Sequence, residues 1–207
     1  MSSAGLLVVI EGVNGAGKSS IIHEVVNHFE SIERPIVVYK FPDRQGLYGS
    51  HIDRYLKGEL TLSSKYDILH MFAANRNSIK SSIDADLADN KIVICDRYVF
   101  SAIAYHIPLT ITDMFHISNY CSVIGHFDKN MPIPDIVYLI EGNHLYRRNV
   151  ANREIFHHFG DKSQKIKNMI YRVIRYFNTR FAVLKNYDGR MHEVVNYIIN
   201  NITELSD

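Results

Sequence analysis

The chain has 207 residues, of which 46% are hydrophobic and 22% charged, and this size suits one compact domain with a sizeable core. Its 23 Lys and Arg residues nearly balance its 22 Asp and Glu residues, for a formal net charge of +1. This balance gives no basic footprint for nucleic acid or an anionic membrane surface, and we expect neither as a partner.

The sequence also lacks the signals of export. No apolar run approaches the roughly 18 residues of a membrane span, and no basic-then-apolar signal pattern opens the chain. Cys95 and Cys121 are far apart in the sequence, and Cys95 lies within an apolar run, so we expect two reduced thiols and no disulfide. These features predict a soluble, cytoplasmic protein.

Strand-like and helical patterns alternate along the chain. The first four strand-like runs are almost continuously apolar, as expected of strands that are covered on both faces. The alternation predicts a single α/β domain over residues 1–207, with a parallel sheet and helices on both of its faces. The predicted strands are Leu6–Glu11, Ile36–Lys40, Ile92–Asp96, Asp135–Glu141 and Phe181–Lys185. The predicted helices are Lys18–Phe29, Ser63–Ala88, Ile111–Cys121, Asp161–Asn178 and His192–Leu205.

The most specific motif lies between the first predicted strand and the first predicted helix. Residues 12–19 read GVNGAGKS, which matches the phosphate-binding loop G-x-x-x-x-G-K-[ST]. Backbone N–H groups at a helix N-terminus would surround the phosphates, with Lys18 on the β- and γ-phosphates and the Ser19 hydroxyl on Mg²⁺. The motif predicts a nucleoside triphosphate site formed by Gly12, Asn14, Gly15, Ala16, Gly17, Lys18, Ser19 and Ser20.

Charged residues follow two other predicted strands. Asp96 and Arg97 end the third strand, and Arg44 follows the second. Since ligands of open parallel sheets bind at the carboxyl ends of the strands, Asp96 is placed to bind Mg²⁺ directly or through water. Arg44 and Arg97 are placed to bind phosphate. Taken singly, each of these residues is better explained by a surface ion pair; together, around one loop, they favour a functional site.

The predicted helix Ser63–Ala88 carries Phe72 and Arg76, which are one helical turn apart on the same face. Phe72 could cover a base while Arg76 donates to its edge. The residues alone leave a second interpretation open, in which Phe72 belongs to the core and Arg76 is solvated.

The segment 147–160 is polar, charged and without period, which predicts a mobile lid over the site. Two further matches indicate little. Asp43–Gly46 fits the D-x-x-G of GTPase switches, but the chain has no N-K-x-D motif for guanine. His157 and His158 have no spaced partners that would suggest a metal site, so a solvated loop is the better interpretation.

In combination, these motifs resemble those of the thymidylate kinase family, from Leu6 to about Phe159. The matching segments are EGVNGAGKS at 11–19, FPDR at 41–44, FAANR at 72–76, DRYVFS at 96–101, AYH at 104–106 and PIPD at 132–135. The resemblance implies a P-loop kinase with a five-stranded parallel sheet flanked by helices on both faces, a short lid at about 147–160, and a homodimer. It also implies the reaction of MgATP with dTMP to give ADP and dTDP.

By the same resemblance, Arg44 and Arg97 hold the dTMP phosphate, Phe72 stacks on thymine and Arg76 contacts a thymine carbonyl. The implied dTMP site comprises Asn14, Phe41, Arg44, Leu56, Phe72, Arg76, Arg97, Ala102, Tyr105 and Phe156.

The chain departs from the family pattern at several positions. Asn14 stands where the family usually has an acid that bonds the sugar 3′-OH, and Phe156 where a tyrosine is frequent. His106 stands where glutamine is common. Gly15 occupies the position at which some members carry a catalytic arginine. The resemblance is then to the subgroup whose lid supplies that arginine, which makes Arg148 the first candidate, Arg153 the second and Arg147 a third.

Two other functions remain open at this point. A deoxynucleoside kinase, or a kinase for a broader set of deoxynucleoside monophosphates, shares the phosphate loop and a D-R motif. A nucleotide-dependent switch protein shares only the loop, and the absence of N-K-x-D argues against it.

Overall fold

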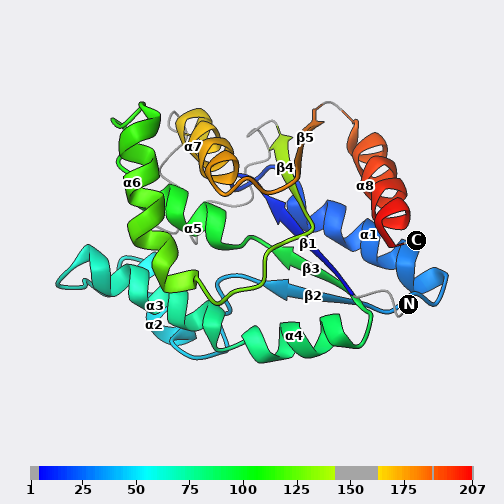
Figure 1. The fold of residues 1–207 in the computed structure, drawn as a ribbon, viewed down its shortest axis with the longest axis horizontal. Coiled ribbons are helices and arrows are strands. Elements are labelled where there is room, and N and C mark those ends of the chain that lie inside the picture. The colour runs from blue at the N-terminus through cyan, green and yellow to red at the C-terminus, as the bar shows by residue number, and fades with distance from the viewer. Residues whose placement is uncertain (1–4, 143–162, 188, 207) are drawn as a thin grey trace.

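The computed structural model describes residues 5–142, 163–187 and 189–206, and it contains a five-stranded sheet between layers of helices (Figure 1). The strand order is β2-β3-β1-β4-β5, and every neighbouring pair is parallel. The carboxyl ends of all five strands therefore lie at one edge of the sheet, with β1 in the centre. The strands are β1 (Leu6–Glu11), β2 (Ile36–Lys40), β3 (Ile92–Asp96), β4 (Ile136–Gly142) and β5 (Phe181–Asn186).

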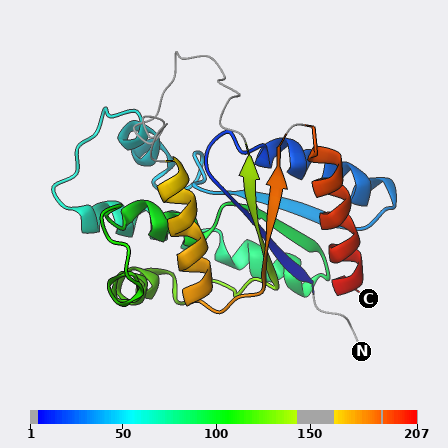
Figure 2. The same cartoon turned by 90° about the horizontal axis from the view of Figure 1, so that it is seen from above.

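Helices cover both faces of the sheet, as predicted. Helices α1 (Lys18–Ser31) and α8 (Met191–Ser206) pack on one face, and α5 (Val99–His106) and α7 (Ser163–Tyr176) lie on the other (Figure 2). None of the helices in the described ranges is long and apolar enough to cross a membrane. The remaining elements are α2 (Gly49–Leu56), α3 (Lys65–Asn77), α4 (Lys80–Ala88), α6 (Met114–Gly125) and the short 3₁₀ helix η1 (His126–Asp128).

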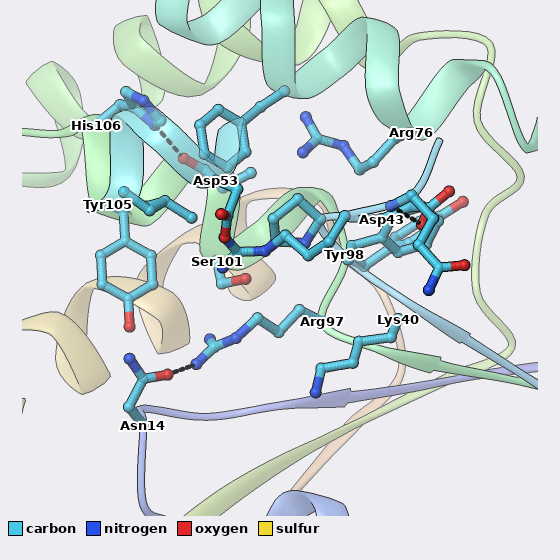
Figure 3. A pocket seen from close by; sticks show the side chains of 17 residues that line it. Asn14, Lys40, Asp43, Asp53, Arg76, Arg97, Tyr98, Ser101, Tyr105 and His106 are labelled. Atoms are coloured by element: carbon cyan, nitrogen blue, oxygen red, sulfur yellow. Dashed lines mark hydrogen bonds and ion pairs between the residues drawn. The ribbon is translucent and has the colours of Figure 1, made fainter. Parts of the chain in front are cut away.

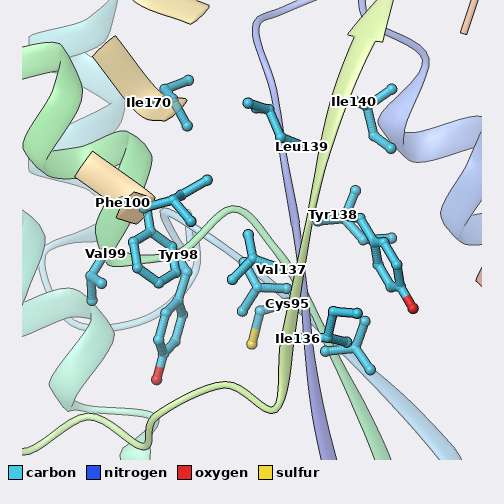
Figure 4. Packing of buried hydrophobic residues seen from close by; sticks show 14 of the residues in the cluster. Cys95, Tyr98, Val99, Phe100, Ile136, Val137, Tyr138, Leu139, Ile140 and Ile170 are labelled. Atoms are coloured by element: carbon cyan, nitrogen blue, oxygen red, sulfur yellow. The ribbon is translucent and has the colours of Figure 1, made fainter. Parts of the chain in front are cut away.

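The main core lies on both sides of β1, β3 and β4. All residues of β1 and β3 are buried, as their continuous apolar sequence predicts for strands covered on both faces. Successive side chains of β4 point to opposite faces, so that Val137 lies on the side of Phe100 and Tyr138 on the other (Figure 4). Cys95 and Cys121 are both buried and free, as expected.

The prediction that the second strand is covered on both faces is wrong. The bounds of β2 agree with the sequence pattern, but its residues are only half-buried or exposed, and Val38 is 39% exposed. The reason is its position, because β2 pairs only with β3 and forms an edge of the sheet. An apolar run does not distinguish an edge strand from a central one.

The prediction of one helix over Ser63–Ala88 is also wrong, since α3 and α4 are separate helices with a break at Ser78 and Ile79. Helix α3 begins at a capping box in which the Ser64 hydroxyl accepts from the N–H of Tyr66. It packs on η1 and α5, whereas α4 packs on β3. One straight helix could not bury side chains in both places.

Two helices were not predicted from the sequence at all. Helices α2 and α5 have only eight residues each, too few for a clear helical period, and α5 is mostly buried. The predicted helix Ile111–Cys121 is observed as α6, which begins later, at Met114. The reason is that Asp113 caps its N-terminus by accepting from the N–H of His116. The predicted lid at 147–160 lies outside the described residues.

Candidate active site

Glycine shapes both ends of the turn between β1 and α1, which holds the phosphate-loop motif. Gly12 has a φ of 146°, and a Cβ there would lie 2.6 Å from the carbonyl oxygen of Ile140. Gly17 has a φ of 90° and is the N-cap of α1, and a Cβ there would collide with the side-chain amide of Asn186. Because the N-cap residue Gly17 has no side chain to cap α1, the first N–H groups of the helix remain for another acceptor. This is the backbone geometry expected of an anion-binding helix N-terminus.

Lys18 is buried beneath this turn. Its Nζ donates to the carbonyl oxygens of Gly12 and Val13, each at 3.0 Å. Burial, and then the nearby positive charge of Arg97, lower the pKa of Lys18 to about 7. An anion beside Nζ would raise this pKa again, because an opposite charge favours the protonated amine. The side chain is thus placed where a bound anion would have a large electrostatic effect.

Arg97 connects the end of β3 to the phosphate loop. Its φ of 70° lies in the left-handed region that residues with a side chain seldom adopt, and such backbone strain is concentrated at functional sites. The guanidinium donates to the carbonyl oxygen of Gly12 at 2.9 Å and to the side-chain oxygen of Asn14 (Figure 3). The two strand ends that were expected to meet are therefore in direct contact.

Glu11 has a role that the sequence did not reveal. Its side chain is fully buried, and Oε1 accepts from the backbone N–H groups of Tyr98 at 2.9 Å and Ser101 at 3.1 Å. Burial raises the pKa of this carboxyl group, while Arg97 and the two N–H groups act in the opposite direction. Glu11 thereby caps the start of α5 and ties the backbone beside Arg97 to β1. The sequence signals for it were an acid at the end of a fully apolar strand and the first position of the matching segment at 11–19.

A cavity of about 610 Å³ opens beside the phosphate loop. Arg97 and Asn14 lie at one end, and Arg76 and His106 lie at the other (Figure 3). Nine of the ten residues expected in the dTMP site line this cavity; the tenth, Phe156, lies outside the described residues. The nine are Asn14, Phe41, Arg44, Leu56, Phe72, Arg76, Arg97, Ala102 and Tyr105.

Arg44 lies in the loop after β2 and lines the cavity. It forms an ion pair with Asp53 of α2 at 2.9 Å, and both side chains are about one-third exposed. The ion-pair interpretation is thus correct for Arg44, although the residue also lines the cavity. The loop is braced by the fully buried Asn75, whose side chain bonds both the N–H and the carbonyl oxygen of Asp43. Asn75 lies in the FAANR segment, yet its structural role was not predicted.

Phe72 fits both interpretations that its sequence left open. It is 8% exposed and belongs to a small buried cluster with Ile52, Leu56 and Met71. It also lines the cavity and meets the ring of His106 edge-on, with 6.1 Å between centroids. A planar ligand in the cavity would therefore contact a ring held in place by core packing.

The alternative that Arg76 is solvated is wrong. Arg76 is 3% exposed, and its Nε and Nη2 donate to the two carboxylate oxygens of Asp128 at 2.9 and 2.6 Å. Asp128 belongs to no motif of the sequence, and no spacing rule links residues 52 positions apart. Tertiary structure alone makes this pair.

His106 contributes a neutral imidazole to the same end of the cavity. Its Nδ1 lies 2.6 Å from the carbonyl oxygen of Ala102, so Nδ1 must carry the hydrogen and donate it. Burial lowers the pKa of His106. In this tautomer Nε2 is an acceptor, and it is buried without a hydrogen-bond partner among the described residues.

The expected metal ligands, Ser19 and Asp96, are both present at the loop. Ser19 is exposed in the first turn of α1, and Asp96 is buried at the end of β3 with one carboxylate oxygen, Oδ1, unpartnered. A buried carboxylate oxygen without a donor is a suitable place for a cation. In the described part of the chain, no group of three or more His, Cys, Asp or Glu side chains could hold a metal ion. Any ion here would need further ligands from water or from a bound nucleotide.

The candidate catalytic arginines Arg147, Arg148 and Arg153 lie outside the described residues. Gly15, the position at which some family members carry arginine, has a φ of 82° and open space around it. Among the described residues, Arg97 and Lys40 are positive charges that act on Lys18 in the loop.

Known proteins with related sequences support one family. A sequence model described as Thymidylate kinase matches residues 10–198, which extends the resemblance well past Phe159. A thymidylate kinase of Dictyostelium discoideum is 28% identical over 142 residues, covering 68% of this chain and 60% of that protein. One from Caenorhabditis elegans is 31% identical over 147 residues, covering 66% and 63%. A putative thymidylate kinase of Invertebrate iridescent virus 6 is 29% identical over 153 residues, covering 74% and 66%. The chain thus spans less than two-thirds of these relatives in each case.

Solved structures agree on the fold. The thymidylate kinase of Candida albicans superposes with a TM-score of 0.69 at 21% identity, covering 100% of this chain and 96% of that one. The enzyme of Ehrlichia chaffeensis gives a TM-score of 0.69 at 22% identity, with coverage of 97% and 99%. The family match includes the phosphate loop, Arg97 at the end of β3 and the helices that line the cavity. On this evidence the chain belongs to the thymidylate kinase family.

Proposed function

We propose that this protein is a thymidylate kinase that transfers the γ-phosphoryl group of ATP to dTMP and forms dTDP. The observation that carries the proposal is a single cavity that adjoins the phosphate loop at Arg97 and ends at the paired Arg76 (Figure 3). A cavity with cationic groups at one end and a ring with a directed donor at the other suits a nucleoside monophosphate.

The acceptor phosphate would lie between Arg97 and Arg44. Two arginines offer planar, paired donors to phosphate oxygens, and the Arg97 position brings that phosphate next to the loop that holds ATP. The thymine ring would lie against Phe72, with Arg76 donating to a base carbonyl. Asn14 would meet the sugar hydroxyl as a neutral partner, since an amide can accept or donate without charge. Phe41, Leu56, Ala102 and Tyr105 would form the walls, with Phe156 reaching the same ligand from the lid.

The reaction needs little covalent chemistry from the protein. The phosphate of dTMP is already ionised and attacks in line, so catalysis consists of positioning and of neutralising charge on the transferred group. Lys18 and Arg97 supply two of these charges. Arg148 or Arg153 of the lid would supply a third on closure, and closure would exclude water that otherwise hydrolyses ATP.

Mg²⁺ would enter with ATP and would neutralise charge on the β- and γ-phosphates. Asp96 and Ser19 would hold it, and the unpartnered Oδ1 of Asp96 fits this role. Two protein oxygens are enough, because Mg²⁺ usually keeps several waters and takes phosphate oxygens as ligands.

We further propose a cytoplasmic homodimer whose ligands are nucleotides and not nucleic acids. The near balance of charges supports the last point, and two free thiols suit a reducing compartment. The dimer rests on the family resemblance. Sedimentation of the purified protein at several concentrations would test it, and a concentration-independent monomer would contradict it.

An acceptor panel with MgATP tests the reaction. We expect transfer to dTMP, weaker transfer to dUMP and none to thymidine. Transfer to thymidine but not to dTMP would identify a deoxynucleoside kinase. ATP turnover that is unchanged by every acceptor would identify a nucleotide-dependent switch or binding protein.

A further inference from the structure

The Arg76 guanidinium is held along one edge only. Its Nε and Nη2 donate to Oδ1 and Oδ2 of Asp128, and the two side chains are 4% and 3% exposed. The remaining group, Nη1, has no hydrogen-bond acceptor among the described residues. Since Arg76 lines the cavity, its outer donor edge is available to a ligand there.

Asp128 is itself fixed by the structure around it. The N–H of Met131 donates to its carbonyl oxygen at 2.9 Å. The neighbouring residue, Phe127, accepts at its carbonyl oxygen from the side chain of Asn77 at 3.2 Å. The Phe127 ring packs on His70, with 4.1 Å between ring centroids. These contacts dock η1 onto α3, so the backbone that carries the Asp128 carboxylate is fixed beside Arg76.

The pair has a definite chemical preference. Both oxygens of Asp128 are occupied by Arg76, and a guanidinium has donors but no acceptor. Arg76 therefore offers a ligand only N–H groups, and a separate acceptor at this end of the cavity is Nε2 of His106. A keto oxygen of a pyrimidine base would be matched, whereas an exocyclic amino group would face another donor. A site that leaves buried donors unpaired rejects the mismatched ligand strongly.

Neutralisation is the second consequence. A buried arginine without a partner is costly, and in the cavity it would attract any anion, including the phosphate of a misplaced acceptor. The Arg76–Asp128 pair has no net charge, yet Arg76 keeps directed donors. This suits an uncharged base, and it directs the acceptor phosphate to the other end of the cavity.

We propose that Asp128 is a positioning residue for base selection, which holds Arg76 so that the site accepts 4-keto pyrimidine nucleotides and rejects 4-amino ones. The inference rests on the proposed function for the class of acceptor. It assigns the choice of base to the pair Arg76 and Asp128, of which only Arg76 belongs to a recognisable motif.

The test uses the full chain and compares kcat/KM for dTMP and dCMP with saturating MgATP. For Asp128→Asn we expect the ratio of the two values to fall roughly tenfold or more, because the amide presents a donor to Arg76 and frees it to rotate. The KM for ATP should stay within about twofold. Asp128→Asn in an Arg76→Met background should have no further effect on the ratio, since a positioning residue acts through its partner.

Controls separate selection from folding. Met131→Ala removes a buried side chain three residues after Asp128 and leaves Arg76 and Asp128 themselves unchanged. It should lower the melting temperature but leave the ratio unchanged. Asp128→Glu keeps the charge and displaces the carboxylate; it should recover stability but not the full ratio. If Asp128→Asn does not fold, Asp128→Glu carries the test.

A wild-type ratio in a folded Asp128→Asn or Asp128→Glu protein would overturn the inference and leave the proposed function intact. The same holds if Met131→Ala lowers the ratio as much as the Asp128 variants do. If the wild-type enzyme does not phosphorylate dTMP, the proposed function fails, and the inference fails with it.

Discussion

The two ends of the cavity hold arginine in opposite electrostatic settings. At the phosphate end, Arg97 bonds the carbonyl oxygen of Gly12 and the amide oxygen of Asn14, which are both uncharged. At the base end, Arg76 meets a carboxylate through two hydrogen bonds. The hydrogen bonds of Arg97 leave its positive charge available to an anion. Those of Arg76 pair its charge with the negative charge of Asp128 and still fix the orientation of its donors.

This contrast shows that two arginines of one cavity can have partners of different charge. Both guanidinium groups line one cavity, and Arg97 is the one beside Lys18, where its positive charge lowers the pKa of the amine. We therefore expect changes at the phosphate end to act mainly on kcat, and changes at the base end to act on acceptor KM and selectivity. The predictions below would break or sharpen that division.

The largest effect is expected from the arginine that the lid would bring to the phosphate end. Because Gly15 supplies no side chain, we expect Arg148→Ala or Arg153→Ala to lower kcat by about 10³-fold with little change in dTMP binding to the free enzyme. Measuring kcat for single alanine variants at 147, 148 and 153 would identify the residue. As a control, Arg175→Ala at an exposed position of α7 should leave kcat unchanged. If none of the three variants loses tenfold, charge neutralisation comes from Lys18, Arg97 and Mg²⁺ alone.

Lys18→Ala should lower kcat by about a hundredfold or more. The ammonium group would lie where negative charge grows in the transition state, and each roughly 1.4 kcal/mol lost there is a factor of ten in rate. Circular dichroism should show an intact fold. Lys91→Ala, at a partly exposed ion pair with Asp86, is the control. Activity within about threefold of wild type would remove Lys18 from the mechanism.

At the base end, Phe72→Ala should raise the KM for dTMP roughly tenfold, because aromatic stacking on a base contributes about 1–3 kcal/mol. The KM for ATP should change little. Met71→Ala is the matched control, since Met71 belongs to the same buried cluster but does not line the cavity. Equal losses for both substrates, or equal effects of the two variants, would make Phe72 purely a core residue.

The smallest predicted effect is the uptake of a fraction of a proton by Lys18 when MgATP binds. The pKa of Lys18 is lowered to about 7 by burial and by Arg97, and bound phosphates would raise it. At pH 8 much of Lys18 is then neutral in the free protein and becomes charged on binding, so binding of MgATP should take up a fraction of a proton. At pH 6 Lys18 is already charged, and the uptake should vanish.

Calorimetry in two buffers of different ionisation enthalpy measures this uptake. Lys18→Met should bind MgATP without the difference between pH 8 and pH 6. The same uptake in wild type and Lys18→Met would assign the proton to another group. It would contradict the prediction that Lys18 becomes protonated when the phosphates bind.

Much of the phosphate end was predictable from the sequence, because its information is local. The loop motif, the strand before it and the helix after it lie within a few residues of one another, and β1, β2 and β3 have the predicted bounds. The burial of the central strands was likewise predictable, because it follows from runs of consecutive apolar residues. Where a function needs backbone geometry at one turn, a short segment contains most of what decides it.

The base end depended on contacts between distant segments. Arg76 and Asp128 are 52 positions apart, and Glu11 reaches residues 87 and 90 positions away to cap α5. The division of one periodic stretch into α3 and α4, and the edge position of β2, likewise depend on what each segment packs against. Local sequence determined which side chains were present and which turn would bind phosphate. Only tertiary structure decided how each charge was paired, since a charge is neutralised by whichever group the fold brings within hydrogen-bonding distance.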